Sequence, residues 1–160
     1  MLDITVICVG KLKEKYYKDA CAEYIKRLGA FCRITVTELA EVRKAEEPSP
    51  AEIDAALAKE AAAVRENIPK GAALIALTPE GQEMSSPELA RTLEKMAAAG
   101  TSKVCFLIGS SDGIDAGLKK EAKMRLSMSP MTFPHHLARV MLLEQVYRAM
   151  NISSGGKYHK

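Results

Sequence analysis

The sequence predicts an α/β protein in which helices cover both faces of a mostly parallel sheet. Short apolar runs rich in β-branched residues alternate with segments whose apolar residues recur at helical spacing. Two of the runs are continuously apolar, as strands buried on both faces of a sheet are. The chain has 160 residues, of which 48% are apolar and 27% charged, and it has no internal repeat. We therefore expect one domain spanning residues 1–160.

The first half of the chain predicts two strands and two helices. A β-branched run ends at Gly10, and a helical pattern stops before Gly29, which stands at the C-cap position. A charged segment with two prolines then separates an alternating run from an alanine-rich one. The expected elements are strand Leu2–Val9, a helix over Tyr17–Leu28, strand Cys32–Leu39, loop Ala40–Pro50 and a helix from Pro50 to about Asn67.

The second half alternates in the same way. Ser86 is expected to cap a helix that has Pro87 at its first position, and Pro134 is expected to open the last helix. Between them lie two buried apolar runs and one shorter strand. The expected elements are strand Ala72–Leu77, a helix from Pro87 to Gly100, strand Val104–Ile108, a short helix over Asp115–Lys123, strand Arg125–Ser129 and a helix from Pro134 to about Asn151.

Charge and cysteine usage bound the class of protein. Residues 103–160 carry nine Lys and Arg against four Asp and Glu, so the C-terminal third of the chain is basic. This excess of positive charge indicates either a surface that binds a polyanion or an ordinary solvated surface. The four cysteines have neither metal-ligand nor redox-motif spacing, which predicts reduced core thiols. No signal peptide or membrane span is recognisable, so we expect a cytoplasmic protein.

Ligands of open α/β sheets bind beyond the carboxyl ends of the strands. Three such ends are prominent here, namely 77–81, 109–113 and 128–133. The glycines of the second are typical either of a backbone that approaches a ligand closely or of a plain turn. The uncharged segment Ser127–Pro134 offers backbone polar groups and an apolar wall to a neutral heterocycle, or it is a buried connection.

The last helix is apolar in nearly every direction, which predicts that a second subunit covers part of it. His135 and His136 at its start are expected to be capping or surface groups, because neither carboxylates nor cysteines accompany them. No metal is expected.

Several motifs together resemble one enzyme family. They are Val9-Gly10-Lys11-Leu12-Lys13, Phe106-Leu107-Ile108-Gly109, Ser127 through Pro134-His135, Arg139, Glu144-Gln145-Val146-Tyr147-Arg148-Ala149 and the ending Tyr158-His159-Lys160. Over essentially its whole length the chain resembles the SPOUT-class ribosomal RNA methyltransferases of the RlmH type, which methylate N3 of a pseudouridine in 23S rRNA of the large ribosomal subunit.

The resemblance implies an α/β fold with a C-terminal trefoil knot, a homodimer, and S-adenosyl-L-methionine held in the knot. Ribosomal RNA, in an assembled ribosome, would be the partner. The implied cofactor contacts are Leu77, Gly109, Met128, Ser129, Pro130, Met131, Thr132 and Phe133. The sequence departs from the family pattern at Ser110, where a second glycine is usual, and at Lys157, where a proline is usual.

The expected catalytic residues are His159, Arg139, Tyr158 and Lys160. The imide nitrogen of pseudouridine must lose a proton before it attacks, and His159 is the candidate base, or else the tail positions the RNA. Arg139 and Lys160 can stabilise charge on the flanking carbonyls. The alternatives are a SPOUT methyltransferase acting on a different rRNA or tRNA base, and a non-catalytic RNA-binding dimer. Six lysines can contact phosphates: Lys11, Lys13, Lys15, Lys119, Lys120 and Lys123.

Overall fold

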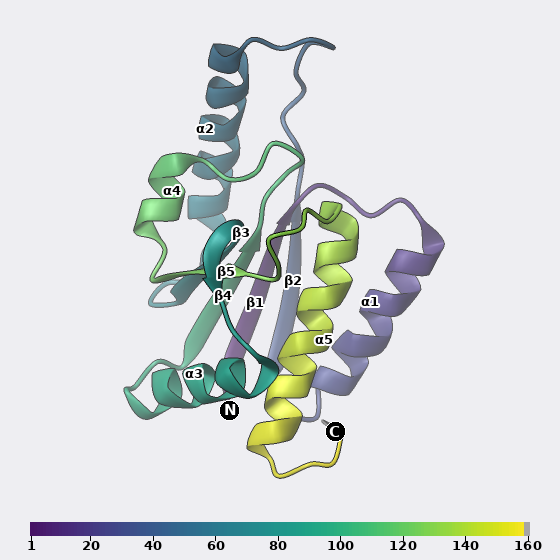
Figure 1. The fold of residues 1–160 in the computed structure, drawn as a ribbon, viewed down its shortest axis with the longest axis vertical. Helices are drawn as coiled ribbons and strands as arrows, with labels where there is room; N and C mark the ends of the chain where they lie inside the picture. Colours follow the sequence, from purple (N-terminus) through teal and green to yellow (C-terminus); the bar gives the residue numbers. More distant parts are fainter. Residues whose placement is uncertain (159–160) are drawn as a thin grey trace.

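The computed structural model describes residues 1–158 and contains one sheet of five parallel strands, in the order β2-β1-β4-β3-β5 (Figure 1). Strands and helices alternate along the chain, as the sequence predicts. The elements are β1 (Asp3–Val9), α1 (Lys15–Leu28), β2 (Arg33–Leu39), α2 (Pro50–Asn67), β3 (Ala73–Glu83), α3 (Ser86–Ala98), β4 (Lys103–Ile108), α4 (Ala116–Glu121), β5 (Met124–Ser127) and α5 (His135–Ser153).

Helices cover both faces of the sheet, which confirms the predicted fold class (Figure 1). On one face α1, α3 and α5 enclose a core that includes Phe106 and Leu142, both fully buried. On the other face α2 and α4 pack Val64 and Leu118 against Leu107. Alternate residues of β4 therefore belong to different cores, which is why this strand is apolar at every position after Lys103.

The centre of the sheet joins distant parts of the chain. β1 pairs on one side with β2, where Asp3 lies opposite Arg33, and on the other with β4, where Asp3 lies opposite Lys103. All of these strands run in one direction, so their carboxyl ends meet at a single edge of the sheet. This edge is where the candidate site lies.

β3 is longer than expected, because the sequence predicts a strand that stops at Leu77. The chain leaves the sheet after Leu77 in an arch over residues 78–81 and returns, so that Leu77 and Gln82 are both paired with Leu126. At Gly81 an added Cβ would lie 2.8 Å from the backbone of Arg125 and Leu126. The arch and β5 thus approach each other through backbone, which explains why the apolar pattern alone misses the second half of the strand.

Serine caps define the starts of two helices. Ser49 and Ser85 each accept a hydrogen bond from the backbone N–H three residues on, at Glu52 and Glu88, while these glutamates bond back to the serine N–H. Such capping boxes satisfy N–H groups that the first helical turn leaves unpaired. Ser85 therefore caps α3, and the expected cap at Ser86 is wrong by one residue, because both serines precede Pro87.

Apart from the end of β3, the other boundaries differ from the expected ones by at most two residues. α5 starts at His135 after Pro134 and extends to Ser153, while β5 starts and ends earlier than expected. Gly29 is the C-cap of α1, but it keeps right-handed helical angles rather than the left-handed conformation usual for a terminal glycine. The four cysteines are buried and unpaired, as expected. Among residues 1–158 there is no helix with the length and apolarity that crossing a membrane requires.

Candidate active site

A cavity of about 640 Å³ opens at the carboxyl edge of the sheet, bounded by the ends of β3, β4 and β5 and the first turn of α5. The three strand ends singled out in the sequence converge there. Of the eight residues expected to contact a cofactor, seven line this cavity: Leu77, Gly109, Met128, Ser129, Met131, Thr132 and Phe133. Pro130 is not among its lining residues, although both of its neighbours are.

The cavity also includes residues that the list of expected contacts omits. His135 and Ala138 line it from α5, and Thr78 lines it from the arch. His135 and Ala138 could have been found from their spacing of three residues. This spacing places both side chains on one face of the first turn of α5, and that turn starts beside the cavity.

Thr78 has a feature that indicates a ligand. Its residue is only 4% exposed, and its Oγ1 has no hydrogen-bond partner among the described residues. A buried hydroxyl without a partner costs free energy, so such groups are usually satisfied by water or a ligand. Thr78 Oγ1 is therefore available to a molecule in the cavity.

Gly109 is required for a different reason from the one expected. We expected its missing Cβ to leave room for a ligand. In the structure an added Cβ would instead collide with the loop itself, at the backbone of Gly113 and 2.7 Å from Cγ1 of Ile114. The loop closes on itself through the hydrogen bond from Gly113 N–H to Ser110 O, at 2.9 Å. Gly109 thus permits the loop to form, and the loop forms the cavity wall.

Ser110 ties this loop to α2. Its hydroxyl donates to Oε1 of Glu60 at 2.8 Å, and Oε2 of Glu60 accepts the backbone N–H of Val42 at 2.9 Å. Ser110 and Glu60 are both buried. Glycine at position 110, which is usual in the family pattern, would leave the buried Glu60 carboxylate without this donor. The serine that replaces it here therefore holds the loop in place through its hydroxyl.

Two further contacts hold the same loop from the segment after β2. Ser111 Oγ donates to Glu41 at 2.7 Å, and Lys44 Nζ lies 2.7 Å from Asp112, which raises the pKa of the lysine. We call these contacts, together with the Ser110–Glu60–Val42 bonds, the loop clasp. The clasp fixes one cavity wall before any ligand arrives.

The segment Ser127–Pro134 forms the opposite wall. The Ser127 hydroxyl lies 2.9 Å from the carbonyl of Pro79 and 3.1 Å from that of Ser129, and Met131 N–H donates to Ser129 Oγ at 3.0 Å. The hydroxyls thus shape the segment, while Met131 remains 73% exposed beside the cavity. The cavity offers apolar surface, backbone polar groups and the Thr78 hydroxyl, which together fit a ligand with a neutral heterocycle.

Arg139 lies beside the cavity rather than in it. It is 3% exposed, and its Nη1 donates to Oε2 of Glu38 at 2.6 Å and its Nη2 to the carbonyl of Gly10 at 3.0 Å. Its Nε has no partner among residues 1–158. Partial burial raises the pKa of Glu38, but the hydrogen bonds from Arg139 and from Leu12 N–H outweigh it, so the net shift is downward. Arg139 joins α5 to the ends of β1 and β2.

Tyr158 lies near the far end of α5. Its hydroxyl donates to Oε1 of Glu144 at 2.9 Å, its backbone N–H donates to Asn151, and its ring contacts Tyr147 edge-on at 4.9 Å. Burial and the neighbouring Glu144 carboxylate raise the pKa of Tyr158. The other two tail residues expected to be catalytic, His159 and Lys160, lie outside the described residues. The structure therefore does not bring Arg139 and Tyr158 together.

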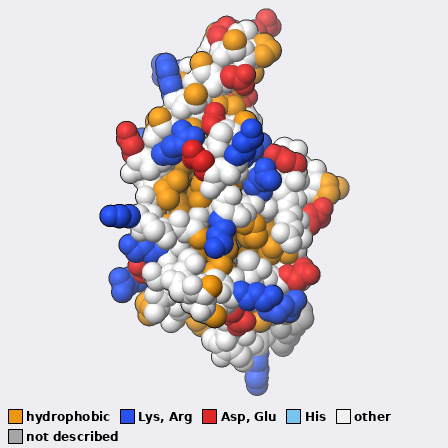
Figure 2. All heavy atoms as spheres, turned by 90° about the vertical axis from the view of Figure 1, so that its left-hand side faces the viewer, with side chains coloured by type: hydrophobic (Ala, Val, Ile, Leu, Met, Phe, Trp, Pro, Cys, Tyr) orange, Lys and Arg blue, Asp and Glu red, His pale blue; other side chains and the backbone are white. Residues whose placement is uncertain are grey.

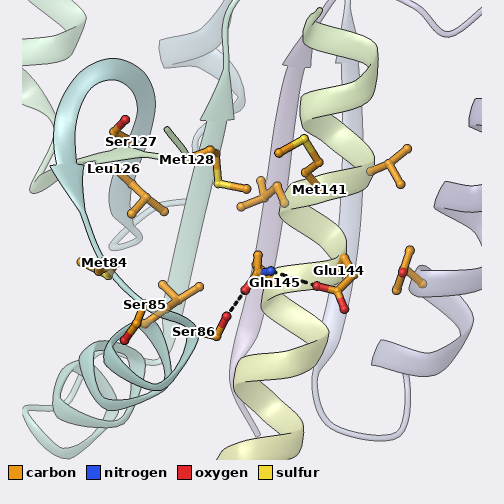
Figure 3. Close-up of a pocket in the computed structure, with 13 residues that line it drawn as sticks. Met84, Ser85, Ser86, Leu126, Ser127, Met128, Met141, Glu144 and Gln145 are labelled. Atoms are coloured by element: carbon orange, nitrogen blue, oxygen red, sulfur yellow. Dashed lines mark hydrogen bonds between the residues drawn. The ribbon is translucent and has the colours of Figure 1, made fainter. Parts of the chain in front are cut away.

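A second hollow of about 400 Å³ lies along α5, between it, α1, the start of α3 and the end of β5 (Figure 3). We call it the α5 groove. Met128 and Met141 point into it, and Ser86 Oγ donates to Gln145 at its floor. Gln145 Nε2 in turn donates to Glu144 at 3.0 Å. Leu142 and Leu143, in contrast, are fully buried within one chain, so these two leucines are not available to the second subunit that the apolar last helix predicts.

Charged groups are prominent on one face of the molecule. On the face that carries α2, α3 and α4, exposed hydrophobic side chains lie among Lys and Arg side chains (Figure 2). Lys119 bonds to Glu80 of the arch at 2.7 Å and lowers the pKa of that carboxyl. Within the described part of the chain, no group of three or more His, Cys, Asp or Glu is arranged to hold a metal ion.

Comparison with known proteins gives concordant results. Residues 2–159 match the family described as "Predicted SPOUT methyltransferase". The chain is 46% identical to the Ribosomal RNA large subunit methyltransferase H of Bacillus pumilus, over 99% of this chain and 100% of that protein. It is 44% identical to the protein of the same name from Bifidobacterium adolescentis, with the same coverage.

A similar fold occurs in a solved structure, that of a probable methylase family protein from Haemophilus influenzae. The similarity has a TM-score of 0.59 at 12% identity and covers 100% of this chain and 72% of the other. At this identity the likeness concerns the fold alone.

Proposed function

Because the chain belongs to the SPOUT methyltransferase family, we propose that it is an S-adenosyl-L-methionine-dependent methyltransferase of ribosomal RNA. Its substrate is N3 of a pseudouridine in 23S rRNA of the large subunit, and it acts in the cytoplasm as a homodimer. The full-length relatives named for large-subunit rRNA methylation support the substrate class. The domain spans residues 1–160, and a trefoil knot near its C-terminus belongs to the same proposal.

The observation that carries this proposal is the convergence of three strand ends on one cavity that contains an unpartnered hydroxyl. Leu77, Gly109 and the residues of 128–133 would hold the cofactor, whose sulfonium supplies an electrophilic methyl group. Thr78 Oγ1 would bond to one of its polar groups. The clasped loop and the apolar wall of Met128 and Phe133 exclude water and fix the cofactor's orientation, which is where catalysis of an in-line displacement chiefly arises.

The C-terminal tail would supply the group that removes the proton. His159 is the proposed base for the pseudouridine imide, because imidazole titrates near pH 6.5. Lys160 would stabilise the negative charge that develops on the flanking carbonyls, and Tyr158 would position the base. Arg139 would act from beside the cavity, through its free Nε–H.

The position of the tail supports the proposed homodimer. α5 has 19 residues and so spans about 28 Å, and the cavity lies at its first turn while Tyr158 is bonded near its end. The tail of one subunit therefore starts far from that subunit's own cavity (Figure 1). A second subunit that packs on the α5 groove would bring its tail to the cavity and would cover Met128 and Met141.

The decisive experiment measures cofactor binding and methyl transfer separately. Calorimetry with S-adenosylhomocysteine should detect one site per subunit, and Thr78→Val should weaken binding by about 5- to 10-fold, the value of one hydrogen bond. Thr35→Val on the edge strand β2 is the matched control and should bind normally. No binding to the wild-type protein would refute the proposal.

Substrate identity is tested with labelled cofactor on intact ribosomes, large subunits, naked 23S rRNA and transfer RNA. Deleting residues 158–160 should leave dimerisation and melting temperature nearly unchanged and reduce methylation by orders of magnitude. Methyl transfer to transfer RNA alone would replace the proposed substrate. Cofactor binding without transfer to any of these RNAs would favour a non-catalytic role.

A further inference from the structure

Four aromatic rings form a row from the protein surface to the cavity. Tyr16 and Tyr17, in the first turn of α1, have ring centroids 4.6 Å apart, and Tyr17 lies 6.0 Å from His136 in the first turn of α5. His136 lies 4.0 Å from His135, which lines the cavity. The two helices start at the same edge of the sheet and run side by side (Figure 1). We call these four residues the ring row.

The outer end of the row contributes little to the fold. Tyr16 is 67% exposed. Among the described residues it is one of four exposed large hydrophobic side chains, the others being Met1, Met131 and Tyr158. Removing so exposed a ring would cost the fold little stability, so packing does not explain why an aromatic residue stands at position 16. The inner end, in contrast, is enclosed: burial lowers the pKa of His135, and its Nε2 would lie 2.9 Å from a Cβ added at Gly10.

Positive charge surrounds the outer end. Residues 11–18 contain four lysines and one glutamate, and all four lysines are exposed. The carboxylate of Glu14 lies 3.9 Å from His136 Nδ1, turned toward the row, and Lys15 pairs with Asp19 at 2.6 Å. The exposed side chains of Lys11, Lys13 and Lys18 can contact an anionic partner.

We propose that the ring row is the path by which a single-stranded segment of RNA reaches the cavity. One base stacks on Tyr16, and the lysines contact the adjoining phosphates. Aromatic platforms within a basic surface are how proteins hold unpaired nucleotides, since every base has a face that can stack and every linkage has a charge. The inference rests on the proposed function and adds to it where, and in what form, the RNA binds.

The test uses the full-length protein and a short fluorescent single-stranded RNA of mixed sequence, followed by anisotropy. Tyr16→Ala should raise the Kd about 5- to 100-fold, the range for losing one stacked base. Tyr16→Leu keeps an apolar side chain on the helix without a ring and should do the same, whereas Tyr16→Phe should bind like wild type. Equal affinity of all four proteins would overturn the proposal.

The charge contribution is measured by salt dependence. Lys11→Ala/Lys13→Ala should lower the slope of log Kd against log salt concentration by about 1.4, or about 0.7 per phosphate contact on a single strand. Lys59→Ala/Lys95→Ala, on α2 and α3, is the matched control and should leave the slope unchanged. Equal slopes for the two double variants would contradict the assignment of this surface.

Failure of the inference and failure of the proposed function give different results. Tyr16→Ala should bind S-adenosylhomocysteine normally and should raise KM for RNA in methyl transfer while kcat at saturating RNA is kept. A wild-type enzyme that methylates rRNA, with KM unaffected by Tyr16→Ala, would refute the ring row alone. Unchanged binding of Tyr16→Ala to a duplex RNA is expected, and an equal loss on duplex and single strand would exclude stacking.

Discussion

Replacing Arg139 by methionine tests whether this arginine holds the fold together. Methionine keeps most of the apolar volume on α5 but removes the bonds to Glu38 at 2.6 Å and to the Gly10 carbonyl at 3.0 Å. Hydrogen bonds to charged groups are worth about 1.5–3 kcal/mol each. The Glu38 side chain is 36% exposed, so water compensates part of the first bond. We expect a loss of about 2–4 kcal/mol.

The assay is thermal and urea unfolding of the wild type, Arg139→Met, Glu38→Gln and the double variant. A domain of this size loses roughly 2–4 °C of melting temperature per kcal/mol, so Arg139→Met should melt about 4–16 °C lower. The cycle should return a coupling of about 1 kcal/mol or more between the two residues. A melting temperature within a degree of wild type, together with lost methyl transfer, would refute the structural role and assign Arg139 to the substrate.

The remaining predictions concern the pH response, the clasp and the dimer. Since the pKa of Glu38 is lowered in the folded state, its contribution to folding stability is complete above about pH 4.5 and is lost as the pH falls through the lowered pKa. The difference in folding free energy between wild type and Glu38→Gln should therefore become smaller in that pH range. A difference that stays constant down to about pH 2 would contradict the direction of the pKa shift. Glu60→Gln should weaken S-adenosylhomocysteine binding several-fold by loosening the loop clasp, whereas Glu66→Gln, at an exposed position of the same helix, should not. Met141→Glu should give monomers by light scattering with the fold retained, because Met141 points into the α5 groove, whereas Leu142→Glu should unfold the subunit; a dimeric Met141→Glu protein would move the interface elsewhere.

The location of the cavity could be predicted from the sequence because it depends on local signals. The strands expected from the sequence end at Leu77, Ile108 and Ser129, and parallel strands bring their carboxyl ends to one edge. Seven expected contact residues meet there for this reason. The family resemblance selected the same residues, and family membership is confirmed by the full-length match.

What the sequence did not predict depends on contacts across the fold. The bond of Ser110 to Glu60 joins residues 50 positions apart, and the arch of β3 depends on pairing with Leu126. An apolar helix has the same sequence pattern whether its own sheet or a second subunit covers it, so the sequence could not show that Leu142 and Leu143 are covered within their own chain. The roles expected of the catalytic residues stay predictions, since His159 and Lys160 lie outside the described residues.

The position of β1 in the sheet has a consequence for synthesis of the protein. β1 is made first, yet its partner β4 lies 100 residues later, with Asp3 opposite Lys103. At about 5–20 residues per second, roughly 5–20 s pass before that partner exists. During this interval one edge of a largely apolar strand has no partner and can pair with other chains. An N-terminal fragment that ends before Lys103 should therefore aggregate when it is released, and the nascent chain is a natural client for chaperones that shield exposed strand edges.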